Sequence, residues 1–124
     1  MKHFVVIILF LISIKVWGQT PCNKLPQNYL NFKEANSQIK NAKFNYSDKF
    51  YSNESSWIKG ARYFSCDKKV GYLFLITDKK EYIFKNIPIH TWLGFKNAPS
   101  AGKYYNTHIR EKYKYLTYVN VKNH

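Results

Sequence analysis

The sequence predicts an α+β fold with an N-terminal helix, a three-stranded antiparallel β-meander, and two short C-terminal helices packed on one face. Three observations favour it. Apolar residues recur at helical spacing early in the chain, three apolar or aromatic runs follow with two short charged turns between them, and two further helical patterns come after Pro88. A chain of 124 residues can form one core but hardly two domains.

The first 18 residues have the organisation of a signal peptide. Lys2 and His3 precede an apolar run of eleven residues, Phe4 to Ile14, which is shorter than the roughly 20 residues of a membrane-spanning helix. We expect cleavage between Gly18 and Gln19. The product is then exported, either periplasmic or secreted, with no membrane span after cleavage; an uncleaved N-terminal anchor is the alternative.

The chain is strongly basic, with 20 Lys and Arg residues against 7 Asp and Glu residues. Removal of Lys2 and Lys15 with the signal peptide lowers the formal net charge from +13 to +11. Such a charge favours contact with polyanions. Arg62 and Arg110 are the two arginines, and the scarcity of arginine argues against sequence-specific reading of bases.

Cys22 and Cys66 are the two cysteines. In an exported protein an even pair predicts a disulfide, which here closes a loop of about 45 residues and stabilises the fold by about 4 kcal/mol. Neither a third cysteine nor a cluster of histidines accompanies the pair, so we expect no metal site and no cofactor.

Residues 19–54 are predicted to be a helical extension followed by a linker. The helix begins at Leu25-Pro26, because proline is tolerated in a first helical turn. Its apolar stripe consists of Tyr29, Phe32, Ala35, Ile39 and Ala42. Residues 45–56 are rich in Asn, Ser and Asp, which is typical of a linker or turn region.

The predicted strands are Trp57–Cys66, Val70–Thr77 and Glu81–Lys85. The second strand is a continuous apolar and aromatic run and is therefore placed at the centre of the sheet. Asp67–Lys69 and Asp78–Lys80 form the two tight turns. Turns this short join adjacent strands, so the meander is antiparallel.

Two short helices follow. Apolar residues recur every three positions from Ile89 to Ala98, and Pro99 ends this first helix. Ser100 is a good N-cap for a second helix from Ala101 to about Lys114. The next segment, 115–121, could instead begin a final short strand, and residues 119–124 are predicted to be a tail.

The order of these features resembles the KTSC domain, a family named for its occurrence at the C-terminus of some lysyl-tRNA synthetases and also found alone in small bacterial proteins. The residues that carry the resemblance are Ser56-Trp57-Ile58, Tyr82-Ile83-Phe84, Ile87-Pro88, Trp92, Phe95, Ala98, Ser100, Gly102, Tyr105-Asn106, Ile109 and Tyr113. We therefore place a KTSC-like domain at residues 55–118. Ala98 to Ile109 is its most specific part, and Phe84 departs from the Y-x-Y that the family usually has in its centre.

The resemblance implies an RNA-binding role by analogy with the synthetases. It also implies structural roles for the motif residues Ser56, Pro88, Ser100, Gly102, Asn106 and Ile109.

No pattern of catalytic residues stands out. His90 and His108 are isolated, and the acidic residues are scattered. We expect a protein that is not an enzyme. A small hydrolase is the third hypothesis, and it requires a polar pocket that joins one of these histidines to an acid.

The leading hypothesis is an exported basic binding module for a polyanion, either nucleic acid or an anionic surface polymer. Exposed tyrosines can stack on bases while neighbouring lysines neutralise phosphates. The candidate stacking aromatics are Tyr72, Tyr82 and Phe84, and the candidate basic face consists of Lys79, Lys80, Lys85, Lys96, Lys103, Arg110 and Lys114. The alternative is a structural or protein-partner interaction domain whose charge serves solubility.

Overall fold

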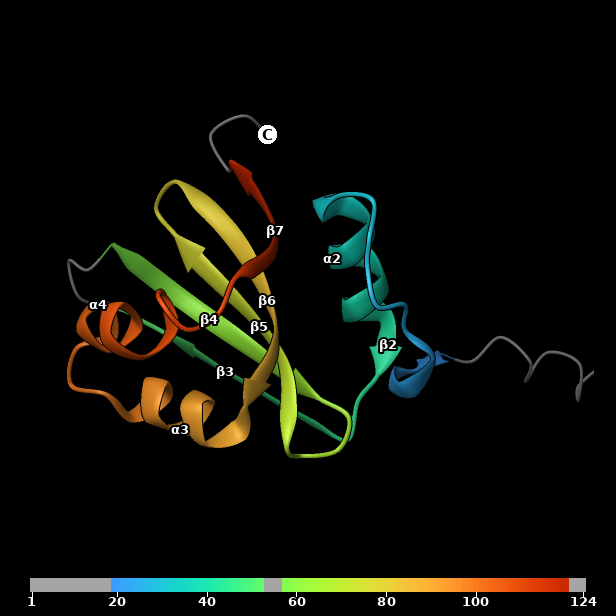
Figure 1. Cartoon of the computed structure of the whole chain (residues 1–124), viewed down its shortest axis with the longest axis horizontal. Helices are drawn as coiled ribbons and strands as arrows, with labels where there is room; N and C mark the ends of the chain where they lie inside the picture. The colour runs from blue at the N-terminus through green and yellow to red at the C-terminus, as the bar shows by residue number, and fades with distance from the viewer. Residues whose placement is uncertain (1–18, 53–56, 121–124) are drawn as a thin grey trace, which may run out of the picture.

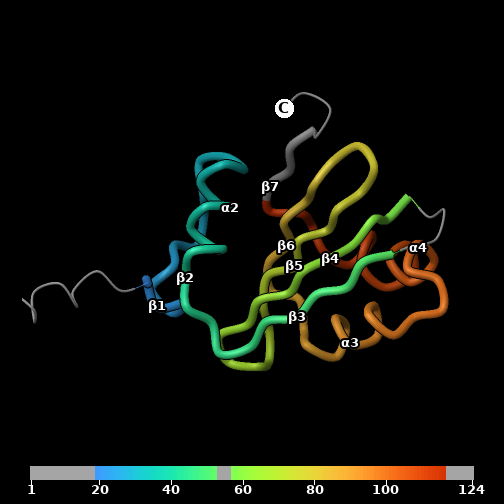
Figure 2. The backbone as a smooth tube through the Cα atoms, turned by 180° about the vertical axis from the view of Figure 1, so that it is seen from behind, coloured from blue at the N-terminus to red at the C-terminus, as the bar shows by residue number. Residues whose placement is uncertain are grey.

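The computed structural model describes residues 19–52 and 57–120, which fold into three layers (Figure 1). A five-stranded antiparallel sheet forms the middle layer. Helix α2 covers one face, and α3 and α4 cover the other, as the view from behind also shows (Figure 2). The predicted signal peptide, residues 1–18, lies outside the described residues, as do Ser56 and the end of the predicted tail. The α+β class is therefore confirmed.

The sheet is a simple meander in which every strand pairs with its neighbours along the chain. Its strands are β3 (Tyr46–Tyr51), β4 (Ile58–Ser65), β5 (Val70–Thr77), β6 (Lys80–Pro88) and β7 (Tyr115–Asn120). Both predicted turns are confirmed, and each is closed by a side chain. Asp67 accepts hydrogen bonds from the amides of Lys69 and Val70, and the Thr77 hydroxyl accepts one from the amide of Lys80.

The prediction of three strands was wrong, because the sheet has an additional strand at each edge. Residues 46–51 are not a linker but β3, in which half-buried Tyr46, Asp48 and Phe50 alternate with exposed residues. The polar Asp48 on the inner face and the aromatic Tyr51 on the outer face hid the period-two pattern. At the other edge, β7 confirms the alternative interpretation of the segment after residue 114.

The face of the sheet toward α3 (Ile89–Asn97) and α4 (Ala101–Tyr104) holds the larger core. The rings of Tyr63 and Trp92 stack there with centroids 5.3 Å apart and an interplanar angle of 8°. The Tyr63 hydroxyl donates a 2.7 Å hydrogen bond to the carbonyl of Ile87. The two predicted C-terminal helices are confirmed on one face, but the second is shorter than predicted and continues as a π-helix, η2 (Tyr105–Ile109).

Helix α2 (Phe32–Asn41) packs on the opposite face of the sheet, where Ala35 and Ile39 contact Phe74 and Ile83. The helix begins later than predicted, because the Asn31 side chain accepts a hydrogen bond from the amide of Glu34 and caps it. The predicted apolar stripe faces the sheet: Ala35, Ile39 and Ala42 are buried, and Tyr29 and Phe32 are half-buried.

The N-terminal segment is fastened to the sheet. Strand β1 (Thr20–Pro21) pairs in parallel with β2 (Ala42–Lys43), and the short helix η1 (Cys22–Lys24) follows β1. The predicted disulfide between Cys22 and Cys66 is present and joins η1 to the end of β4. Among the described residues, no helix has the length and apolar character needed to cross a membrane. In the same part of the chain, no three His, Cys, Asp or Glu side chains gather as metal ligands.

Candidate functional site

An open hollow of about 430 Å³ lies where the start of β4, the strand β6 and the π-helix η2 meet. Its lining consists of Trp57, Tyr82, Tyr105, Asn106 and Arg110. We call it the motif hollow, because four of these five residues belong to the sequence pattern that runs from residue 56 to residue 113. None of the described residues that line it is Asp or Glu.

The backbone explains why these side chains converge. Along β6 alternate residues share a face, so Tyr82 points toward the helical layer together with Phe84. Trp57 stands at the start of β4, and its carbonyl accepts a 3.2 Å hydrogen bond from the amide of Asp78 in the next turn. A Cβ at Gly102 would lie 2.9 Å from Nε1 of Trp57, so glycine at this position lets the indole rest against α4.

Aromatic contacts hold the walls of the motif hollow. The rings of Trp57 and Tyr105 meet edge to face at 5.4 Å, and those of Tyr82 and Tyr115 meet in the same way at 5.2 Å. Trp57 nevertheless keeps 41% of its surface exposed. A flat ligand can therefore reach an indole whose orientation is already fixed.

The wide turn of η2 supplies the polar groups. The amide of Arg110 bonds to the carbonyl of Tyr105 at 2.9 Å, which closes the π-turn. Asn106 and Arg110, one helical turn apart, are both exposed at the rim of the motif hollow. Burial raises the pKa of the Tyr105 hydroxyl and nearby Tyr82 adds to the rise, while the positive charge of Arg110 opposes it. Tyr105 is therefore a neutral phenol at physiological pH.

One of the comparisons with known proteins gives a match. Residues 54–113 match the family model of the KTSC domain. This chain carries a KTSC domain. No curated protein and no solved structure matches it. The matched segment contains β4 to β6 and the helices that follow, so the whole lining of the motif hollow falls inside the KTSC domain, whereas β3 and β7 flank it.

The seven cations of the predicted basic face fall into separate groups in the structure of the KTSC domain. Arg110 lines the motif hollow, and Lys79 and Lys80 lie in the β5–β6 turn that Trp57 contacts. Lys80 precedes Tyr82 by two residues on β6 and so shares its side of the sheet. These three residues are brought together at one end of the sheet.

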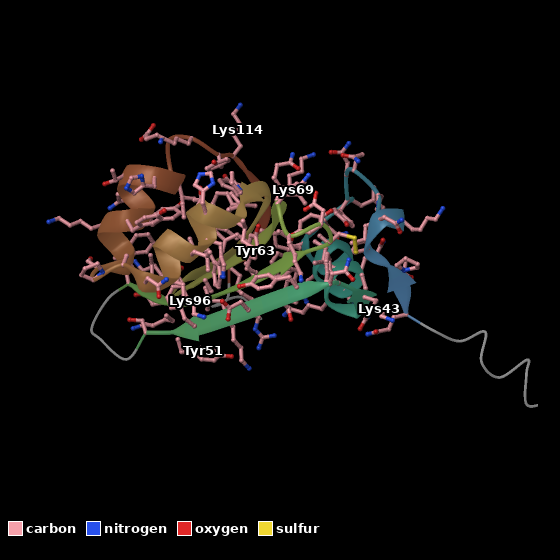
Figure 3. All side chains as sticks on the ribbon, turned by 90° about the horizontal axis from the view of Figure 1, so that it is seen from below. Lys43, Tyr51, Tyr63, Lys69, Lys96 and Lys114 are labelled. Carbon is pink, nitrogen blue, oxygen red and sulfur yellow. A yellow bond between two sulfur atoms is a disulfide. The ribbon has the colours of Figure 1, made fainter. Side chains whose placement is uncertain are left out.

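The other four predicted cations lie elsewhere. Lys96 forms an ion pair of 2.9 Å with Asp48 beside β3, whereas Lys114 lies next to β7 at the opposite edge of the sheet (Figure 3). Lys85 donates a hydrogen bond to the carbonyl of Gln27 on the α2 side. Lys103 lines a separate hollow beside α4. The seven residues therefore do not form one continuous face.

Of the predicted stacking aromatics, Tyr82 alone lines the motif hollow. Phe84 is 1% exposed and packs in the core, so its interpretation as a stacking residue was wrong. Tyr72 lies on the α2 side of the sheet, where its hydroxyl is 3.5 Å from that of Tyr29. The two tyrosines of the predicted platform thus occupy opposite faces, because their strand positions differ in parity once β5 and β6 are paired.

Most of the motif residues have the structural roles expected of them. Pro88 occupies the N-cap position of α3, and the Ser100 hydroxyl accepts a hydrogen bond from the amide of Lys103. Ile109 is fully buried. Asn106 differs, because it is exposed at the motif hollow. The sequence analysis did not identify Trp57, Tyr105 and Asn106 as residues of a candidate binding hollow, although their place in the family pattern could have done so.

The hydrolase hypothesis requires a pocket that joins a histidine to an acid. The hollow that His108 lines is not such a pocket. His108 lies over the ring of Tyr104 with centroids 4.4 Å apart. The hollow beside it, of about 460 Å³, is also lined by Ser100, Lys103 and Thr107, and its described lining contains no carboxylate. His90 is exposed at the start of α3.

Proposed function

We propose that this protein is an exported binding module for a polyanion whose units carry flat rings, of which single-stranded nucleic acid fits best. The observation that supports the proposal is the lining of the motif hollow: aromatic rings, one amide and one guanidinium converge there from three segments of the KTSC domain.

Each group has a matching part in a nucleotide. Trp57, partly exposed and held in place by Tyr105, offers a face on which a base can stack. Arg110 can bind two phosphate oxygens at once through its planar fork. The Asn106 amide can donate to and accept from the edge of a base. Lys79 and Lys80 extend the positive charge along the path of a bound strand.

The proposal of export rests on the signal-like first 18 residues and is supported by the Cys22–Cys66 disulfide. Such bonds persist in oxidising compartments. Anionic surface polymers are also present outside the cytoplasm, and these differ from nucleic acid in lacking stackable rings. A ring-free polymer therefore separates the two ligand classes.

The experiment uses the full chain with Trp17→Phe, so that Trp57 and Trp92 are its two tryptophans. Its fluorescence is followed during titration with short oligothymidylate and, separately, with inorganic polyphosphate. We expect oligothymidylate to quench Trp57, with a log–log salt slope of about −0.7 per phosphate contact. Trp92 is fully buried and supplies a constant background. Trp57→Leu should cost about 1–3 kcal/mol of affinity for oligothymidylate and leave polyphosphate binding nearly unchanged.

Arg110→Gln should weaken the binding of both polymers and reduce the salt slope by about one contact. Lys33→Gln on α2, an exposed position on the other side of the sheet, is the control with the same change in net charge. Absence of binding to either polymer at low salt would refute the proposal. Capture of one protein partner that survives high salt would instead support the alternative of a protein-interaction domain.

A further inference from the structure

The α2 side of the sheet carries a second set of cations, unrelated to the motif hollow. Lys49 on β3 and Arg62 on β4 are direct cross-strand partners. Arg62 is in turn paired with Phe74 on β5, and Nζ of Lys40 from α2 lies 5.5 Å from the centre of the Phe74 ring. We call Lys40, Lys49 and Arg62 the cationic row.

Like charges directly opposite each other on a sheet destabilise it, so a row of this kind calls for a compensating charge. The described residues supply little negative charge close to the row. On this face Glu81 is separated from Arg62 by the intervening strand β5. Asp48 points to the other face, where Trp92 and Lys96 bind its carboxylate. The row therefore has an excess of positive charge.

Arg62 is held in place, but one of its hydrogen-bond donors lacks a partner among the described residues. Its Nη2 donates a 3.4 Å hydrogen bond to the hydroxyl of Tyr51, while its buried Nε has no hydrogen-bond partner among the described residues. Tyr51 is 57% exposed, and Nζ of Lys49 lies 5.8 Å from the centre of its ring. The hydrogen bond from Arg62 and the nearby charges of Arg62 and Lys49 lower the pKa of Tyr51, as expected in a strongly positive environment.

A shallow hollow of about 380 Å³ adjoins these groups and is lined by Ser47, Asp48, Lys49, Arg62 and Phe64. In Figure 3 the Tyr51 side chain projects from the surface of β3 on the side away from Lys114. Lys49 and Arg62 thus line one hollow, and the exposed ring and hydroxyl of Tyr51 adjoin these two cations.

We propose that the cationic row binds a phosphate monoester whose organic part carries a ring. A monoester is a dianion at pH 7, which matches two facing cations better than a singly charged diester or sulfate ester does. Arg62 binds two phosphate oxygens, Lys49 and Lys40 neutralise the charge, and Tyr51 contacts the ring of the ligand. Lys40, Lys49 and Tyr51 precede the matched KTSC segment, whereas Arg62 lies within it on β4. The site therefore combines this chain's N-terminal extension with the KTSC domain and lies on the other face from the motif hollow.

The test is calorimetric titration of the full chain at low salt with phenyl phosphate, inorganic phosphate and phenyl sulfate. We expect phenyl phosphate to bind most tightly. Inorganic phosphate should bind more weakly because it lacks the ring, and phenyl sulfate more weakly because it carries one charge. Equal affinity for phenyl sulfate and phenyl phosphate, or no binding of phenyl phosphate, would overturn the proposal.

Variants locate the site. Arg62→Gln should weaken the binding of phenyl phosphate at least about tenfold, because a charge-assisted hydrogen bond is lost. Lys49→Gln tests the same site at an exposed position where folding is not at risk. Lys112→Gln, an exposed lysine of the helical layer, should leave the affinity within about twofold. A loss with Arg110→Gln equal to that with Arg62→Gln would place the phosphate in the motif hollow and refute this inference without touching the proposed function.

Discussion

The indole nitrogen of Trp92 donates a 3.0 Å hydrogen bond to Oδ2 of Asp48, the same oxygen that accepts a 2.9 Å bond from Nζ of Lys96. Trp92 and Lys96 lie on α3, and Asp48 lies on the edge strand β3. The contact joins β3, which precedes the matched KTSC segment, to a helix within that segment. Burial alone would raise the pKa of Asp48, but the hydrogen bonds from Lys96 and Trp92 lower it.

We predict that Asp48→Asn lowers stability at pH 7 by about 1 kcal/mol, because a charge-assisted hydrogen bond becomes a neutral one. The carboxylate's folded pKa lies below its ordinary value of 3.8, so its contribution is present above that pH and is lost as pH falls through the folded pKa. Urea unfolding between pH 2 and pH 7 should therefore show a flatter acid limb in the variant. Glu111→Gln removes an exposed carboxylate as the control. An unchanged acid limb in Asp48→Asn would contradict this account.

Gly102→Ala tests the support of the motif hollow. The added methyl group would lie 2.9 Å from Nε1 of Trp57, so the indole must swing outward, which should shift its emission to longer wavelength. We expect a loss of about 1 kcal/mol in stability. In a Trp57→Ala background the same change should be neutral or stabilising, because alanine is the better helix former. If the cost of Gly102→Ala were the same in both backgrounds, Trp57 would not be its cause.

Reduction of the Cys22–Cys66 bond should lower the free energy of unfolding by about 4 kcal/mol, because the bond restricts a long loop in the unfolded chain. The measurement is the urea midpoint with and without reductant. In the Cys22→Ser, Cys66→Ser double variant the midpoint should be low in both conditions. A wild-type midpoint insensitive to reductant would show that packing of α2 alone holds the N-terminal segment.

Tyr63→Phe should lower stability at pH 7 by about 1–2 kcal/mol, because the carbonyl of Ile87 then loses its buried donor. Burial raises the pKa of Tyr63 above its ordinary value of 10.0. Its ionisation is thus easier in the unfolded chain, and stability that is intact below pH 10 declines as pH rises toward the folded pKa. Thermal unfolding between pH 7 and pH 11 should show a smaller alkaline loss in the variant. An equally steep alkaline loss of stability in the variant would show that ionisable groups other than Tyr63 cause it.

The apolar pattern alone was sufficient to predict β4, β5 and α3. The two strands bury most of their residues, and α3 buries Trp92 and Phe95 at helical spacing. It failed for β3, because the polar and half-buried Asp48 looks like a turn former and the aromatic Tyr51 lies on the exposed side of the strand. The half-buried carboxylate is acceptable only because Trp92 and Lys96 reach it from a helix far away in the sequence.

For the candidate site, too, the sequence predicted some features and the packing of the chain decided others. Composition predicted a basic, aromatic-rich surface, and the family pattern contained most residues of the motif hollow. Sheet parity then placed Tyr72 and Tyr82 on opposite faces, and packing buried Phe84. No spacing rule indicated that Lys40, Lys49 and Arg62 form a row, because they come from α2, β3 and β4 and meet through strand pairing.

The sequence by itself determined the α+β class, the two turns, the pairing of the two cysteines and the presence of a KTSC domain. The class, the turns and the domain depend on local spacing, and two cysteines can pair within the chain in one way. The tertiary structure alone decided the number of strands, which face each tyrosine occupies and which cations share a surface. Those properties depend on register and on the layer that covers each face, and both are set by contacts between residues distant in the chain.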